Sequence, residues 1–559
     1  MRFKLFILFT ISFVVAHSQN LNIIKHVGEF GIDETRSLII TRWDDSLSAT
    51  DLSNYSSVSL SLDNRPFTFS SAPSNLGLNQ NYFIGDNLTG NVYTLYFTNL
   101  PLVSINSTST IIDDPKVLAD FTYADQFQNV SSQIGIELRG ASSLSFPKKT
   151  YDLELWADAA GNDSRDLSFA GMRDDDDWVL DALYNEPLRI RSFLANKLWL
   201  DLHSPHYLND EPNAKAGADA AYVELFVNGD YRGIYNLMEQ VDKKQLQLKS
   251  YNGSVRGELY KGETWGASTF WNTPVIDNTS RYWGGFEMKY PDEDDITDWT
   301  PVESFVDFVI DSSNTDFNSQ IFTLFNKENF IDYFIFLNLL RATDNTGKNI
   351  YLAKYRNGFP YFHTPWDLDG CFGTIYNGNQ ENITDDILSN GLISRILRQN
   401  PENVKETMAL RWFELRNGLI NDIELADRIN TLFNKFTNEK IYERESLVYT
   451  NYNYDANDLN YIQNWITART QFLDQYFGRF LSSDQLNKTE FKIYPNPARD
   501  YLEIQAESNL EGLEYTITNA LGQMLRSGTI SENEIDVNDL VPGIYLLSVD
   551  GNSVRFIKQ

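Results

Sequence analysis

Three things are scarce in this sequence, and each scarcity excludes a class of protein. Cys371 is the only cysteine, so there is no disulfide framework. Acidic residues outnumber basic ones by 77 to 46, and the net charge of −31 makes nucleic acid and anionic membranes poor partners. No apolar run after the N-terminal one is long enough to cross a membrane as a helix, so we expect no transmembrane segment in the mature chain.

The chain begins with an export signal. Two basic residues precede an apolar core at Leu5–Val15, and the short run Ala16–Ser18 follows it. This pattern is typical of a secretory signal peptide over residues 1–18, with cleavage just before Gln19. The apolar core is too short to span a membrane, so we expect an exported protein.

The length of 559 residues predicts two or three domains. Residues 19–99 are expected to form the first of them. Short alternating runs such as Ser57–Leu62 and Val92–Phe97, separated by Asn, Ser, Asp and Gly, indicate a small all-β domain. This region shows no cluster of catalytic residues, and we expect a role in spacing or packing.

The rest of the chain is organised around Arg341–Gly373. This stretch follows an apolar run at Phe330–Leu340 that is typical of a buried helix. Within it, Ile350–Tyr355 and Phe359–His363 are β-rich runs joined by a turn at Arg356–Gly358, which predicts a hairpin. The hairpin would bring the polar residues before it beside those after it.

These polar residues form a pattern with chemical meaning. Asp344 and Asn349 are separated by four residues, and Asp367 and Asp369 follow the hairpin. Protein kinases position phosphates and divalent metal with an Asp, four residues, an Asn and then a metal-binding Asp after a hairpin. Oxygen ligands without Cys or His suit Mg²⁺ or Mn²⁺. A polar Asx-rich loop followed by an aspartate turn is the alternative interpretation.

A loop of small residues between two predicted strands is a candidate phosphate site. The first strand ends at Arg139, and Ser142 and Ser143 lie in the loop that follows. Backbone N–H groups in such a loop can hold an anion, so the loop is a plausible lid or phosphate cradle.

The second of these strands carries a candidate lysine. Lys149 shares a face with apolar residues by the two-residue period of a strand, and it could point into a cleft and hold phosphate as a point charge. Lys148 would lie on the opposite face unless a β-bulge exchanges the two. Glu239, at the end of a later strand, could pair with Lys149 as the lysine–glutamate pair of kinases does. A snorkelling lysine and a surface glutamate are the alternatives.

Six sequence blocks occur in a recognisable order. They are R-G-A-S-S with F-P-K-K-T-Y-D-L-E-L, D-W-V-L-D-A-L-Y, V-N-G-D-Y-R-G-I-Y-N-L-M-E, L-Y-K-G, D-N-T-G-K-N and P-W-D-L-D-G. This order resembles the CotH family of secreted atypical protein kinases, over about residues 100–478. Two departures stand out. Asn185-Glu186 occurs where an aspartate-bearing turn is expected, and Cys371 occupies a position that is usually small and unreactive.

The resemblance implies a divergent protein-kinase-like core at residues 100–480. This core would bind ATP with Mg²⁺ or Mn²⁺ and transfer the γ-phosphate to Ser or Thr of an exported protein. The site residues that it implies are the catalytic Asp344, the metal-binding Asp367 with Asn349 and Asp369 in support, a phosphate-contacting Lys148 or Lys149, and Glu239.

The chain changes character after residue 480. Residues 481–490 are polar and predict a linker, and short alternating strands over residues 491–559 predict a small β-sandwich. The Y-P-N-P-A, N-A-L-G-Q and P-G-I-Y blocks of this region resemble the C-terminal sorting domain of type IX (Por) secretion. By that resemblance the type IX machinery carries the protein from the periplasm of a Gram-negative bacterium to its surface or surroundings.

The sequence therefore predicts an α+β protein in which a kinase-like core stands between an all-β domain and a sorting domain. Two other functions stay open for the core. One is a non-catalytic surface protein that uses the same fold for adhesion or glycan binding. The other is a metal-dependent phosphohydrolase that uses the same aspartates.

Overall fold

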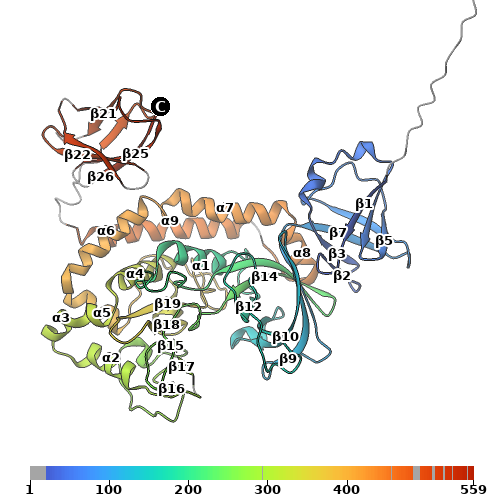
Figure 1. Cartoon of the computed structure of the whole chain (residues 1–559), viewed down its shortest axis with the longest axis horizontal. Coiled ribbons are helices and arrows are strands. Elements are labelled where there is room, and N and C mark those ends of the chain that lie inside the picture. The colour runs from blue at the N-terminus through green and yellow to red at the C-terminus, as the bar shows by residue number, and fades with distance from the viewer. Residues whose placement is uncertain are drawn as a thin grey trace, which may run out of the picture. The chain divides into compact units, whose positions relative to one another are not determined.

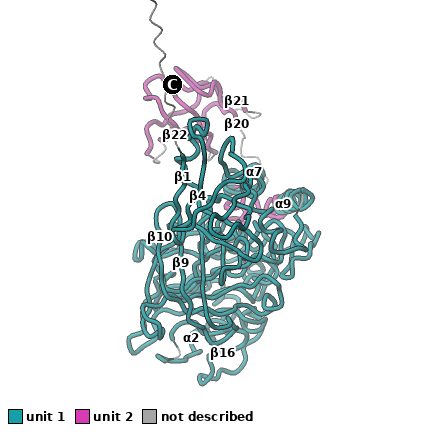
Figure 2. The backbone as a smooth tube through the Cα atoms, turned by 90° about the vertical axis from the view of Figure 1, so that its right-hand side faces the viewer, with its two compact units in different colours: residues 1–404, 414–473 teal, residues 405–413, 474–559 magenta. Residues whose placement is uncertain are grey.

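The computed structural model describes residues 20–292, 294–454, 456–481, 491–506, 510–519, 523–531, 533–549 and 552–559. The predicted signal peptide, and the predicted linker apart from Leu481, lie outside the described residues. The chain forms two compact units (Figure 2), Met1–Val404 with Glu414–Leu473, and Lys405–Phe413 with Asp474–Gln559. The predicted N-terminal domain and most of the predicted kinase-like core belong to the first unit.

The N-terminal region is a seven-stranded sheet, as its alternating runs predict. The strand order is β1 (Asn20–Lys25), β4 (Ser57–Leu62), β5 (Arg65–Phe69), β6 (Asn81–Asp86), β7 (Val92–Thr98), β3 (Leu38–Arg42) and β2 (Phe30–Asp33). Inward-facing residues such as Leu60, Phe67 and Leu95 are fully buried in one core. Alternation of apolar and polar residues along each strand places them there.

A closed barrel of seven strands comes next in the chain (Figure 1). Its order is β10 (Asn129–Arg139), β11 (Thr150–Trp156), β12 (Asp177–Asp181), β14 (Asp230–Glu239), β13 (Ala220–Val227), β8 (Leu102–Asn106) and β9 (Val117–Ala124). Alternate side chains point inward. In β11, for example, Tyr151, Leu153 and Leu155 are buried in the barrel core, while their neighbours are half-buried.

A second sheet carries the predicted hairpin. Its order is β16 (Tyr282–Trp283), β17 (Phe286–Tyr290), β15 (Glu258–Gly262), β18 (Ile350–Lys354) and β19 (Tyr361–Pro365). The hairpin prediction is confirmed, since β18 pairs antiparallel with β19 from Ile350 opposite Pro365 to Lys354 opposite Tyr361.

The predicted buried helix is also confirmed, as α4 (Lys327–Leu340). All of its residues from Asn329 to Leu340 are buried. The Asn329 side chain joins the helix to β19, because it accepts a hydrogen bond from the His363 N–H (2.7 Å) and donates one to the His363 carbonyl (2.9 Å). The helix is therefore locked to the hairpin at its N-terminal end.

Eight more α-helices occur in the described part of the chain. They are α1 (Arg191–Leu202), α2 (Thr300–Asp311), α3 (Asn314–Leu324), α5 (Gly391–Gln399), α6 (Val404–Arg416), α7 (Asp422–Asn438), α8 (Ile441–Val448) and α9 (Ala456–Gly478). The helices α7 and α9 run side by side (Figure 1), where Gln463 donates a hydrogen bond to Asn430 (2.9 Å). None of the helices among the described residues is long and apolar enough to cross a membrane.

The C-terminal region forms two small sheets around one core. One contains β20 (Phe491–Tyr494), β21 (Tyr501–Ala506) and β24 (Glu534–Asp536), and the other β23 (Met524–Thr529), β22 (Glu514–Asn519), β25 (Gly543–Val549) and β26 (Asn552–Lys558). Leu502, Ile517 and Phe556 are fully buried between them. The predicted β-sandwich is confirmed. Of its N-A-L-G-Q block, Ala520, Leu521 and Gly522 lie outside the described residues.

Candidate active site

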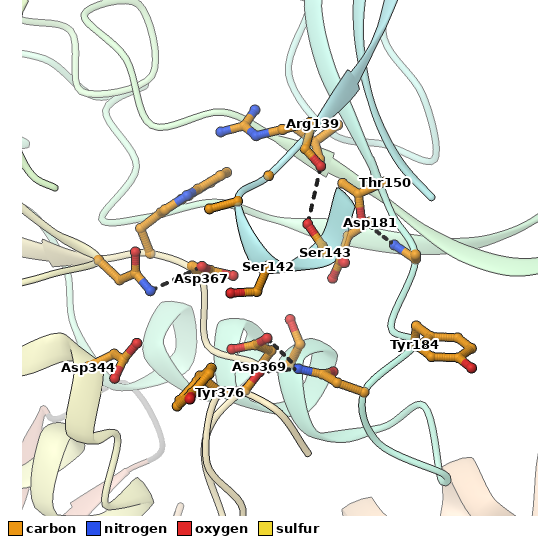
Figure 3. Close-up of a pocket in the computed structure, with 18 of the residues that line it drawn as sticks. Arg139, Ser142, Ser143, Thr150, Asp181, Tyr184, Asp344, Asp367, Asp369 and Tyr376 are labelled. Atoms are coloured by element: carbon orange, nitrogen blue, oxygen red, sulfur yellow. Dashed lines mark hydrogen bonds between the residues drawn. The ribbon is translucent and has the colours of Figure 1, made fainter. Parts of the chain in front are cut away.

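A cleft with a volume of about 420 Å³ lies between the barrel and the second sheet (Figure 3). The barrel contributes the ends of β10 and β12 and the loop after each of them. The other wall comes from β15 and from the segments on either side of the β18–β19 hairpin. The polar residues that line the cleft include Arg139, Ser142, Ser143, Asp181, Asn185, Lys261, Asp344, Lys348, Asn349, Asp367 and Asp369.

The hairpin brings the predicted acidic residues to this one cleft. Asp344 lies in the short helix η5 (Thr343–Thr346), soon after α4 ends, and Asp367 lies two residues after β19. The Asn349 Nδ2 donates a hydrogen bond of 3.0 Å to Oδ2 of Asp367. In Figure 3, Asp344, Asp367 and Asp369 stand around the same space.

Buried hydrogen bonds hold this arrangement in place. The Tyr333 hydroxyl of α4 donates to the carbonyl of Asn345 (2.8 Å), and the Asn345 amide donates to the carbonyl of Trp366 (2.8 Å). The backbone N–H of Asn349 donates to the carbonyl of Gly262 at the end of β15 (2.9 Å). The segments before and after the hairpin are therefore tied to each other and to the neighbouring strand.

The backbone of Asn349 and of Asp367 is left-handed, with φ of +53° at each residue. Few residues other than glycine adopt this conformation, although Asn and Asp do so more readily than others. Such residues gather at functional sites, where the surrounding structure imposes the conformation. Here it is imposed on both members of one hydrogen-bonded pair.

Burial shifts the acidity of two of the carboxyl groups. It raises the pKa of Asp344, although Lys348 Nζ, 3.9 Å from its carboxylate, acts in the opposite direction. Burial also raises the pKa of Asp369 well above its usual range, and the charges of Asp367 and Asp181 add to the effect. The Asn185 amide, which donates to Asp369, only partly offsets it. The lining also has more acidic than basic residues, with Asp181, Glu263, Asp344, Asp367 and Asp369 against Arg139, Lys261 and Lys348.

Asp181 is a further acidic residue of the cleft that the sequence interpretation missed. It is the last residue of β12, and burial with the charge of Asp367 raises its pKa to about 6. The D-W-V-L-D block contained a signal for it, because alternation along a strand places Asp181 on the same face as Asp177 and Val179, opposite Trp178. That rule identifies a face, but not which face borders a cleft.

The donor groups of the cleft fit a divalent cation that also binds phosphate. Mg²⁺ is usually held by one or two carboxylates together with substrate phosphates, rather than by a cage of protein ligands. Asp367 and Asp369, with the Asn349 side chain beside them, form such a small oxygen-rich set. Asp166, Asp175 and Asp176 form another cluster of carboxylates among the described residues, with ligand atoms within 4.8 Å of one another. Lys244 forms ion pairs with all three, so a cation already lies beside them.

Three basic side chains line the cleft, those of Arg139, Lys261 and Lys348. Arg139 donates to Asp152 (2.7 Å) and to Gln240 (3.2 Å), and its guanidinium lies over the Trp366 ring at 5.2 Å. Lys261 of β15 pairs with Glu263, and Lys348 lies beside Asp344. The sequence interpretation included Arg139 but missed both lysines. The L-Y-K-G block contains Lys261, but nothing in it indicates that strand β15 borders the cleft.

The predicted small-residue loop also reaches the cleft. Ser142 and Ser143 belong to the short helix η3 (Ser142–Ser145), and Ser143 Oγ donates to the carbonyl of Arg139 (3.2 Å). Gly140 has φ of +114°, and a Cβ added there would lie 1.8 Å from Ser143 Oγ. Only glycine therefore permits this tight turn at the cleft edge.

The predicted lysines lie elsewhere. Lys148 is fully buried, where its Nζ donates to the carbonyl of Ile234 (2.6 Å) and to Glu445 of α8 (2.7 Å). Burial lowers the pKa of Lys148 to about 8. Lys149 Nζ donates to the carbonyl of Leu144 (2.6 Å). Neither lysine lines the cleft, so the structure does not bring either of them to the aspartates.

Glu239 does not face Lys149 either. It is fully buried, its Oε1 accepts from Lys215 Nζ (2.5 Å) and from the Arg173 N–H (2.9 Å), and its Oε2 accepts from Gln245 (3.1 Å). The predicted pairing with Lys149 is corrected to a pairing with Lys215. The reason is that Glu239, paired with Trp178 across β12 and β14, points away from the cleft face of the barrel.

The two departures from the family pattern have structural roles. Asn185 holds Asp369 in the cleft, whereas Glu186 accepts hydrogen bonds from the N–H groups of Leu188 and Arg191 (2.9 and 3.0 Å) and pairs with the Arg191 side chain (3.0 Å). Glu186 therefore stabilises the start of α1. Cys371 is buried, and burial raises the pKa of its thiol well above the usual value, as expected of an unreactive packing residue.

Comparison with known proteins agrees with this architecture. The family described as CotH kinase protein matches residues 136–473, which contain every residue of the cleft discussed above. The family described as secretion system C-terminal sorting domain matches residues 492–559, the β-sandwich. No curated protein matches the chain. Because the first match covers more than half of its 559 residues, the chain belongs to the CotH kinase family and carries a C-terminal secretion sorting domain.

Proposed function

We propose that this protein is an exported protein kinase that transfers the γ-phosphate of ATP to Ser or Thr of an exported or surface protein. The observation that carries the proposal is the single cleft in which Asp344, Asp367 and the Asn349 amide meet. The same types of residue, at the same spacing around a hairpin, serve phosphoryl transfer in protein kinases. Membership of the CotH kinase family supports the proposal.

The proposal gives separate roles to Asp344, on the side of the acceptor, and to Asp367, Asp369 and Asn349, on the side of the metal. Asp344 accepts the hydrogen bond of the acceptor hydroxyl, orients its oxygen toward the γ-phosphorus and takes its proton as the phosphoester forms and ADP leaves. The raised pKa of Asp344 suits a group that must bind a proton during the reaction. Asp367 and Asp369, with Asn349, would hold Mg²⁺ or Mn²⁺, which supplies neutralisation of phosphate charge when bound.

The cations of the cleft complete the assignment. Arg139, Lys261 and Lys348 neutralise phosphate oxygens of ATP, and the loop with Ser142 and Ser143 covers them from the barrel side. In this assignment Lys261 takes the part that the sequence interpretation gave to Lys148 or Lys149. Its partner Glu263 would then be the counterpart of the glutamate expected at Glu239.

The sorting domain indicates a secreted or cell-surface protein. We propose that the type IX machinery exports it and that it passes through the periplasm of a Gram-negative bacterium.

The test uses the exported chain from Gln19 to Gln559, incubated with ATP and Mg²⁺ or Mn²⁺ beside Asp367→Asn. We expect a gain of phosphate on the protein or on a generic acceptor, seen by intact mass, that the variant loses. Release of free phosphate without any phosphorylated protein would favour a phosphohydrolase. Absence of both, with no heat of ATP binding, would favour a non-catalytic binding protein.

A further inference from the structure

A second hollow of about 450 Å³ lies next to the cleft and has exposed tryptophans in its wall. Trp265 is 56% exposed and Trp271 is 62% exposed, which is unusual for side chains of this size. We call this hollow, lined by these two rings and by Gly, Thr, Ser and Asn residues, the tryptophan groove. None of the described residues that line it is charged.

The loop that presents the two rings is firmly built. Between them in the chain, Ala267, Ser268 and Phe270 are buried, so the loop is anchored from within while the two rings point outward. A Cβ added at Gly391, in the first turn of α5, would lie 1.9 Å from the Phe270 carbonyl oxygen, which shows how closely helix and loop pack. The exposure of the rings is therefore a property of an ordered surface.

The tryptophan groove and the cleft share one short segment of chain. Asp344 and Lys348 line the cleft, whereas Thr346, between them, lines the groove. Lys348 connects the two sites, since its Nζ lies 5.7 Å from the centre of the Trp265 ring and 3.9 Å from the Asp344 carboxylate. A ligand seated in the groove would therefore extend directly toward the residue proposed to orient the acceptor hydroxyl.

The polar groups of the groove are largely engaged within the protein. Thr269 donates to the carbonyl of Gly266 (2.6 Å), and Thr346 donates to that of Thr343 (3.1 Å). Asn390 accepts from the Ile393 N–H (3.0 Å) and donates to the carbonyl of Thr346 (2.9 Å). A sugar would need free amide and hydroxyl groups in the groove as hydrogen-bond partners for its own hydroxyls. A polypeptide held by ring packing against the two tryptophans would not need them.

We propose that the tryptophan groove binds the acceptor polypeptide, through an uncharged stretch with proline or an aromatic residue beside the phosphorylated Ser or Thr. This rests on the kinase function proposed above. Aromatic-lined grooves recognise extended proline-containing segments because the rings pack against a backbone that is already extended. The lack of charge in the lining selects against acidic and basic stretches, which would lose hydration without gaining a partner.

The experiment compares synthetic peptides that carry one central serine, flanked either by proline and tyrosine or by glycine alone. The exported chain, its Trp271→Ala variant and the matched control Phe127→Ala are tested with each peptide. Phe127 is 85% exposed on the barrel and lines neither hollow. We expect Trp271→Ala to raise the KM for the flanked peptide about tenfold, as for an aromatic anchor of an interface, with the KM for ATP unchanged. Trp271→Tyr should restore most of the affinity, because it keeps a ring.

The same peptides, now with a fluorescent label, are also titrated with the Asp367→Asn variant. This measurement separates the inference from the kinase function, because peptide binding needs no transfer of phosphate. Peptide binding that depends on Trp271 supports the groove even if no phosphate is transferred. Equal affinities for both peptides, or equal effects of Trp271→Ala and Phe127→Ala, would overturn the inference. Trp271-dependent binding of a labelled oligosaccharide, with no binding of peptide, would overturn it in favour of a glycan.

Discussion

The Nδ2 of Asn349 lies 3.0 Å from Oδ2 of Asp367, and both residues have a left-handed backbone with φ of +53°. They lie 18 positions apart in the chain, on either side of the β18–β19 hairpin. The amide holds the carboxylate in one orientation in the cleft. Groups that orient a metal ligand in this way have large effects on metal affinity when they are removed.

Replacing Asn349 by glycine isolates the effect of this amide. Glycine adopts the left-handed backbone without strain, so Asn349→Gly should fold while Asp367 loses its hydrogen-bond donor. We expect the affinity for Mn²⁺ with ATP to fall about 10- to 100-fold, measured by calorimetry. Asn228→Gly, at the same φ of +53° in the β13–β14 turn, is the matched control. Equal affinity in Asn349→Gly and the native chain would show that Asp367 needs no such support.

Lys148 and Lys149 should respond differently to the same substitution. Lys148→Met leaves Glu445 buried, with Arg189 at 3.4 Å as its one remaining ion-pair partner among the described residues, and the free energy of unfolding should fall by about 3 to 5 kcal/mol. Lys149→Met removes one half-buried hydrogen bond and should cost about 1 kcal/mol. Urea unfolding measures both, and ATP affinity of the folded protein should change in neither. A stable Lys148→Met that no longer binds ATP would instead make Lys148 a phosphate ligand.

Lys261 is the lysine that we expect to matter for ATP. Removing its charge by Lys261→Met takes one charged hydrogen bond from the phosphates, and the KM for ATP should rise at least about tenfold. Lys354→Met is the control, since Lys354 lies in the neighbouring strand, pairs with Glu258 at 3.3 Å and does not line the cleft. A similar KM for the two variants would exclude Lys261 from the phosphate site.

Local patterns in the sequence were enough to predict much of this structure. The helix before Arg341–Gly373, the hairpin and the C-terminal sandwich depend on apolar periodicity and on turn residues, which act over a few positions. Asp344, Asn349, Asp367 and Asp369 reach one cleft because a single hairpin separates them. Their juxtaposition follows from local structure alone.

The lysines and Glu239 could not be placed in the same way. Whether a strand residue faces a cleft or a buried partner depends on which element packs there, and the partner of Lys148, Glu445, lies 297 positions away. Lys261 faces the cleft only because β15 pairs with β18, more than eighty positions later. Closure of the barrel also depends on such distant pairings, for example β8 with β13. Alternation along one strand carries no information about them.

The pH dependence of stability should reveal the excess negative charge of the cleft. The pKa of Asp181 is raised from 3.8 to about 6, so the folded state holds its proton more tightly than the unfolded chain does. The stabilisation that Asp181 contributes to the folded state is fully present below 3.8, the pKa of this group in the unfolded chain. It is lost as the pH rises through about 6. Burial is the larger cause, and the charge of Asp367 adds to it. A divalent cation in the cleft would offset the loss only once the carboxylates are ionised.

We therefore expect Mn²⁺ with ATP to raise the melting temperature little at about pH 5 and clearly at about pH 8, since only the ionised carboxylates attract the cation. Without metal, Asp181→Asn should raise the melting temperature at the higher pH, because it removes a buried carboxylate whose negative charge destabilises the folded state. Asp120→Asn, at an exposed position of β9, is the control and should change neither result. A metal-induced shift of the same size at both pH values would contradict the idea that ionisation of the cleft carboxylates governs cation binding.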